Sequence, residues 1–112
     1  MKIVLNSCYG GFSLSEEAVL KYAQKKGIKL VQNKEEYFKP FYKDEIKVEN
    51  YFSEREIPRD DFDLIETVEE LGEKANVVYA ELRIVTIPDD VDWEIEEYDG
   101  KEWISEKHRT WY

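Results

Sequence analysis

Residues 6–13 carry the first residue types that could bind an anionic ligand. Gly10 and Gly11 follow a short apolar run and precede a stretch with helical spacing. Glycines let a backbone approach a ligand closely, and the N-terminus of a helix offers N–H groups to an anion. The segment has neither the Gly-x-Gly-x-x-Gly spacing nor a Gly-Lys-Ser/Thr ending. A tight strand-to-helix turn with positive φ explains the same glycines without a ligand.

The C-terminal tail, residues 106–112, is the second candidate. It is the basic and aromatic cluster of an otherwise acidic half of the chain. The guanidinium of Arg109 suits a phosphate or a carboxylate, and the ring of Trp111 suits a nucleobase. An edge strand, in which Arg109 pairs with neighbouring acids and Trp111 packs in the core, is the other interpretation.

Together the two segments predict a site for a nucleotide-like molecule. If the last strand lies beside the first, the glycine loop holds a phosphate, the tail neutralises it, and an aromatic ring stacks on the base. The predicted binding residues are Asn6, Tyr9, Gly10, Gly11, Ser13, Trp103, His108, Arg109 and Trp111. Because one small domain offers little concave surface, enclosure of the ligand by two or more copies stays open.

Catalytic and metal sites have weaker support. Cys8 and His108 are a conceivable nucleophile and base, but no spacing selects them, and a buried, inert cysteine is commoner. One His and one Cys cannot form a zinc site without carboxylates, and residues 89–92 lack the pattern of a calcium loop. We therefore expect a binding protein, not an enzyme, with no metal and no cofactor.

Charge is unevenly distributed along the chain, whose net charge is −10. Residues 1–47 hold nine lysines against six acids, whereas residues 48–112 hold twenty acids against seven basic residues. Nucleic-acid binding through the second half is therefore disfavoured. The run 89–106, with nine acids and one lysine, suits a basic protein partner or a solvated face.

The elements that position these residues follow from periodicity. The apolar run in residues 1–6 predicts a buried strand, and Ser13 with Glu16 fits the capping box of a helix that ends at Gly27. Residues 32–59 predict short, irregular strands in an aromatic-rich excursion. The remaining predicted elements are a strand at 28–31, a helix at 61–74 capped by Asp60 or Asp61, and a strand within 78–87.

Asp99-Gly100 predicts the tip of a β-hairpin formed by residues 93–98 and 101–105. A two-residue turn places Ile95 opposite Ile104 and Glu97 opposite Glu102. The two glutamates repel each other unless a cation, a basic partner or solvent relieves them.

These elements predict one α+β domain over residues 1–112. We expect a mixed β-sheet of four or more strands, with the first strand central, two helices packed on the sheet and a C-terminal β-hairpin. No apolar run approaches the ~20 residues that cross a bilayer. A single cysteine, Cys8, suits a reducing compartment, so we expect a cytoplasmic protein without a membrane partner.

Two segments of the chain have distinctive sequences. Residues 6–15 read Asn-Ser-Cys-Tyr-Gly-Gly-Phe-Ser-Leu-Ser, and residues 87–100, continuing to Trp111, begin Ile-Pro-Asp-Asp-Val-Asp-Trp-Glu-Ile-Glu-Glu-Tyr-Asp-Gly. The first resembles the start, and the second the end, of a family of small uncharacterised proteins encoded by tailed bacteriophages. Residues 57–61 look similar too. The family has no settled activity, so no residue roles carry over. The resemblance implies an accessory protein in an infected bacterial cytoplasm.

That context gives three hypotheses. The first is a counter-defence protein that binds and sequesters a nucleotide-derived signal without catalysis. The second is an acidic, nucleic-acid-mimicking inhibitor of a basic host defence protein, of the anti-CRISPR or anti-restriction type. The third is a structural or regulatory interaction protein. The glycine loop and the tail favour the first, and the run 89–106 favours the second.

Overall fold

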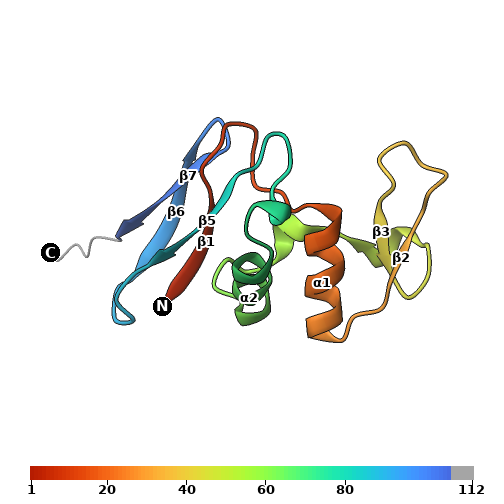
Figure 1. The fold of residues 1–112 in the computed structure, drawn as a ribbon, viewed down its shortest axis with the longest axis horizontal. Helices are drawn as coiled ribbons and strands as arrows, with labels where there is room; N and C mark the ends of the chain where they lie inside the picture. Colours follow the sequence, from red (N-terminus) through yellow and green to blue (C-terminus); the bar gives the residue numbers. More distant parts are fainter. Residues whose placement is uncertain (107–112) are drawn as a thin grey trace, which may run out of the picture.

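The computed structural model describes residues 1–106, which form an α+β fold (Figure 1). Its helices are α1 (Glu16–Lys26) and α2 (Phe62–Leu71), and its strands are β1 (Lys2–Asn6), β2 (Leu30–Gln32), β3 (Phe41–Lys43), β4 (Tyr51–Phe52), β5 (Leu82–Thr86), β6 (Trp93–Tyr98) and β7 (Lys101–Glu106). The predicted class, helices and C-terminal hairpin are confirmed. The strands of the described residues do not join in one mixed sheet, because they pair antiparallel as β1–β5, β2–β3–β4 and β6–β7.

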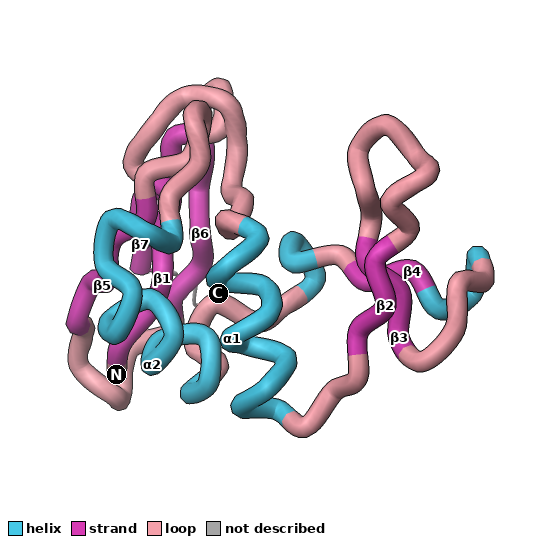
Figure 2. The backbone as a smooth tube through the Cα atoms, turned by 45° about the vertical axis from the view of Figure 1, so that its right-hand side comes forward, coloured by secondary structure: helices cyan, strands magenta, loops and turns pink. Residues whose placement is uncertain are grey.

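Strand β1 lies at the centre of the body of the molecule. Ile3, Val4 and Leu5 are at most 1% exposed, as the apolar run predicts. One edge of β1 pairs with β5 over its whole length. At the other edge, the Val4 N–H donates to the carbonyl oxygen of Arg59 at 2.9 Å, and β7 lies alongside (Figures 1 and 2). A single loop residue therefore takes the hydrogen bond that a neighbouring strand would otherwise take.

Both helices begin at a capping side chain. For α1 the cap is Ser15, whose Oγ accepts from the Ala18 N–H at 3.1 Å. The predicted capping role of Ser13 is wrong, because its hydroxyl donates to Glu54 Oε1 instead. For α2 the cap is Asp61, one of the two residues predicted, and the helix ends at Leu71, where the short 3₁₀ helix η3 (Gly72–Ala75) follows.

The two helices pack side by side (Figure 1). Ion pairs connect lysines of α1 to acids at the start and along the length of α2. The pairs join Lys21 to Glu70, Lys25 to Glu66 and Glu70, and Lys26 to Asp61 and Asp63, while Lys2 of β1 reaches Glu69. The lysine excess of the first half is thus matched by acids of α2.

Strands β2–β4 form a lobe that projects from the body, giving a molecule of 54 × 27 × 26 Å (Figure 2). Phe52 of β4 is 8% exposed and belongs to the same hydrophobic core as Val4 and Leu64. Its ring centroid lies 6.4 Å from that of Tyr22 in α1. The excursion predicted for residues 32–59 is therefore a small sheet anchored to the body by an aromatic contact. No helix within residues 1–106 has the length and apolar character to span a membrane.

Candidate ligand-binding site

The amide of Asn6 organises the loop that follows β1. Its Nδ2 donates to the carbonyl oxygens of Cys8 at 2.7 Å and Gly100 at 2.8 Å, and its Oδ1 accepts from the N–H groups of Cys8 at 3.2 Å and Glu81 at 3.0 Å. Asn6 is fully buried. Because all of its hydrogen-bonding capacity is used inside the protein, its predicted role as a ligand-binding residue is replaced by a structural one.

The glycine loop contacts the tip of the hairpin. The Gly10 N–H donates to the Asp99 carbonyl oxygen at 2.9 Å. A Cβ at Gly100 would lie 2.1 Å from the Gly11 nitrogen, and a Cβ at Gly10 would lie 2.6 Å from Cβ of Tyr79. These glycines allow close backbone packing, and Gly10 and Gly11 have φ of 126° and 105°, as the turn that explains them without a ligand requires. The adjacency of the first and last strands, on which the predicted site depends, is present.

A buried ion pair joins the hairpin to β1. The Arg59 guanidinium donates to both carboxylate oxygens of Glu102, with Nη2 2.8 Å from Oε2, and lies over the Phe12 ring with Cζ 3.6 Å from the centroid. Glu102 Oε1 also accepts from the Asn6 N–H at 2.8 Å. The hairpin register sets Glu97 opposite Glu102, as predicted, and Arg59 supplies the cation that relieves their repulsion.

A cavity of about 340 Å³ opens beside the glycine loop. Its lining includes Gly10, Gly11, Ser13, Arg55 and Tyr79. The Arg55 Nη2 lies 3.7 Å from the point that a Cβ of Gly11 would occupy. Within residues 1–106, no ion pair is formed by Arg55, which lies in the short 3₁₀ helix η2 (Glu54–Glu56) and is exposed. A guanidinium, glycine backbone and an aromatic ring thus face one open cavity.

The other predicted site residues are divided between different surfaces. Trp103 lies on the outer face of the hairpin, 42% exposed, and its Nε1 donates to Glu96 at 3.0 Å. The Tyr9 ring lies 5.7 Å from Nζ of Lys101. Neither residue lines the cavity. His108, Arg109 and Trp111 lie outside the described residues.

The N-terminus of α1 is not the predicted phosphate site. The Ser15 N–H donates to the Ala75 carbonyl oxygen at 2.9 Å, and its hydroxyl donates to the Lys74 carbonyl oxygen at 2.6 Å. Residues of η3 therefore cover the start of the helix, and Glu16 and Glu17 add negative charge there. An anion meets repulsion at that point.

Sequence reasoning missed Arg55 and Tyr79. Arg55 lies 44 positions after Gly11, and Tyr79 lies 69 positions after Gly10. In the sequence Arg55 stands between two acids, Glu54 and Glu56, a pattern typical of a solvated segment. This pattern does not indicate which residues Arg55 meets, because the cavity forms only when η2 and the turn at 77–80 reach the glycine loop.

Among residues 1–106, no group of three or more His, Cys, Asp or Glu side chains is placed to hold a metal ion. Comparison with known proteins found no matching family, curated protein or solved structure.

Proposed function

We propose that this protein acts by binding, without chemical turnover, and that it holds a nucleotide-like molecule in the cavity beside Gly10 and Gly11. The observation that carries the proposal is the Arg55 guanidinium, which faces this cavity without an ion-pair partner in residues 1–106. A guanidinium suits a phosphate because its planar fork donates two parallel hydrogen bonds.

The walls of the cavity suit the other parts of such a ligand. Tyr79 is 70% exposed, so its ring is accessible for stacking on a base. The absence of a side chain at Gly11 leaves room for a phosphate beside the guanidinium. A volume of about 340 Å³ lies at the small end of the range for ligand sites, which suits a mononucleotide or a cyclic nucleotide.

The biological role that we propose is sequestration of a nucleotide-derived signal by a phage counter-defence protein. The resemblance of the two ends of the chain to phage accessory proteins supports this context. A protein that only removes a signal needs affinity and no catalytic group. The proposed site fits that requirement, since it combines a cation with an aromatic ring.

The test is isothermal titration calorimetry of the full chain against cyclic mononucleotides, cyclic dinucleotides and ADP-ribose. We expect binding by the wild type and a loss of about tenfold or more in Arg55→Ala, since a charge-assisted hydrogen bond contributes about 1.5–3 kcal/mol. Arg83→Ala is the matched control, because Arg83 is also exposed but does not line this cavity. Absence of binding across the panel, or equal loss in both variants, contradicts the proposal.

A second function is favoured by the outer face of the hairpin. Glu94 and Glu96 are exposed on the same face as Tyr98 and Trp103, which are 72% and 42% exposed. Tyr and Trp rings surrounded by charge are typical of protein interfaces. We propose, as the alternative, that this face binds a basic host protein, as an acidic nucleic-acid mimic does.

Pull-down and titration against the purified basic partner test this alternative. The double variant Glu94→Gln/Glu96→Gln is expected to weaken binding and flatten its salt dependence. Glu97 is left intact, because it lies on the opposite face and accepts from the Gly100 N–H. Glu35→Gln/Glu49→Gln, which changes the charge equally outside the hairpin, is the control. Equal effects of the two double variants exclude a specific role for the hairpin.

A further inference from the structure

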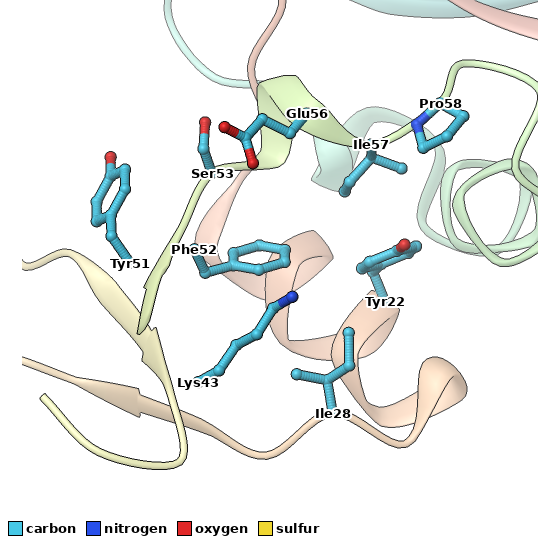
Figure 3. Close-up of a pocket in the computed structure, with 9 residues that line it drawn as sticks. All are labelled: Tyr22, Ile28, Lys43, Tyr51, Phe52, Ser53, Glu56, Ile57 and Pro58. Atoms are coloured by element: carbon cyan, nitrogen blue, oxygen red, sulfur yellow. The ribbon is translucent and has the colours of Figure 1, made fainter. Parts of the chain in front are cut away.

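A separate pocket lies at the waist of the molecule, where the lobe joins the body (Figure 3). It has a volume of about 200 Å³, and its walls come from α1, β3, β4 and η2. No residue of this pocket lines the cavity at the glycine loop. A ligand of this pocket is therefore independent of the nucleotide proposed for the cavity at the glycine loop.

Two opposite charges face this pocket from different sides. Figure 3 shows the Lys43 side chain of β3 on one side and the Glu56 carboxylate of η2 on the other, with Phe52 between them. Neither side chain forms an ion pair with another residue of the described chain 1–106. An ammonium and a carboxylate that face one pocket but do not pair are suited to a ligand that carries both charges.

The remaining walls define the body of such a ligand. Phe52 and Ile57 give the pocket an apolar part of its wall, of which 8% and 6% remain exposed. Ser53 also lines the pocket and adds a hydroxyl group to its wall (Figure 3). At roughly 30 Å³ per water molecule in the liquid, the pocket holds a molecule of about the size of a free amino acid.

We infer that the waist pocket binds a small zwitterion with an apolar side chain, of the class of the free aliphatic α-amino acids. Lys43 holds the carboxylate, and Glu56 with Ser53 holds the ammonium group. The side chain of the ligand lies against Phe52 and Ile57. A molecule with only one of the two charges leaves either Lys43 or Glu56 without its partner, and therefore binds more weakly.

Calorimetric titration of the full chain with L-valine, L-leucine and L-isoleucine at millimolar concentrations tests the inference. Isovalerate and isobutylamine are the matched probes, because each carries one of the two charges of L-valine. We expect binding of at least one amino acid, weakened about tenfold in Lys43→Gln and in Glu56→Gln. Lys34→Gln, an exposed lobe lysine away from the pocket, is expected to bind as the wild type does.

Amide chemical shifts in ¹⁵N-labelled protein locate the bound amino acid. We expect changes at Phe52, Ser53 and Glu56 and none at Gly10 or Gly11. No heat with any amino acid, isovalerate binding as tight as L-valine binding, or shifts confined to the glycine loop would each overturn the inference. Failure of nucleotides to bind at the other cavity leaves these readouts unchanged, so the two proposals fail separately.

Discussion

At the scale of single residues, Arg59 and Glu102 take the place of a missing strand at the free edge of β1. Arg59 meets this edge twice, since its carbonyl oxygen accepts from the Val4 N–H and its Nη1 donates to the Val4 carbonyl oxygen at 3.4 Å. Glu102 accepts from the next free N–H, that of Asn6. A buried polar group left without a partner is costly, so these residues depend on each other.

Removing Arg59 is therefore expected to destabilise the protein strongly. Arg59→Ala leaves the carboxylate of Glu102, which is 8% exposed, without its cation, and we expect a loss of about 3 kcal/mol in the free energy of unfolding. Urea denaturation measures this loss. Lys2→Ala breaks the exposed pair with Glu69 and is expected to cost less than about 1 kcal/mol. Equal costs for the two variants would show that Arg59 does not stabilise the edge of β1.

At the scale of elements, the hairpin is attached to the body through its tip. Strands β6 and β7 form no backbone ladder with β1 in the described chain, and the hairpin contacts β1 instead through Glu102 of β7 and the backbone of Gly100 in the turn. At the tip, Gly100 has a φ of 90° and lies against the glycine loop. The position of the hairpin thus depends on a backbone contact that admits no side chain.

Gly100→Ala is expected to detach the hairpin from β1. The added Cβ would lie 2.1 Å from the Gly11 nitrogen, which is backbone and cannot rotate away. Gly27→Ala is the control, since Gly27 also has a positive φ of 75° but has open space around its Cα, and we expect a cost of about 1 kcal/mol there. Hydrogen exchange of β7 amides measures the effect. Unchanged protection in Gly100→Ala would show that the contact can relax.

The ion pairs between α1 and α2 predict a pH dependence of stability. Hydrogen bonds from Lys21 and Lys25 lower the pKa of the Glu70 carboxyl from its ordinary 4.5 to about 2. A lowered pKa in the folded state contributes stability above pH 4.5, and this contribution is lost as the pH falls towards 2. In Glu70→Gln this part of the profile is expected to flatten, measured as urea midpoints from pH 2 to 6 at low salt. Glu73→Gln, with no ion pair in residues 1–106, should keep the wild-type profile.

At the scale of the whole molecule, a body and a lobe share one hydrophobic core. Phe52 carries the core into the lobe, while Phe41 and Leu30 pack against it from the lobe side. The chain passes between the two parts only after α1 and after β4 (Figures 1 and 2). The orientation of the lobe therefore depends strongly on this aromatic contact.

Phe52→Ala is expected to separate the stability of the lobe from that of the body. Loss of a buried phenylalanine costs about 3–5 kcal/mol, and here the cavity opens between the two parts. We expect hydrogen exchange to rise more in β2 and β3 than in β1 and β5. Tyr51→Ala, which removes a ring that is 56% exposed, is the control. A uniform rise across all of these strands would indicate one cooperative unit.

Local patterns in the sequence determined the elements of this fold. The apolar run of β1, the cap at Asp61 and the Asp99-Gly100 turn with its register all depend on neighbours within a few positions. Hydrophobic periodicity and turn residues are properties of short stretches of sequence. The predictions that rest on them, namely the buried strand, the helix cap and the hairpin register, are therefore confirmed. The sequence also predicted that Glu97 and Glu102 repel each other unless a cation, a basic partner or solvent relieves them, and the structure supplies a cation, Arg59.

Only the tertiary structure decided the contacts between distant segments. Arg59 meets Glu102 across 43 positions, and Arg55 reaches Gly11 across 44. The tertiary structure also divides the strands among separate sheets, because strand pairing depends on which strand edges the packed helices and the Arg59 loop leave free. Periodicity within a segment does not indicate which strand pairs with it. Side chains far apart in the sequence meet only when the core forms between them.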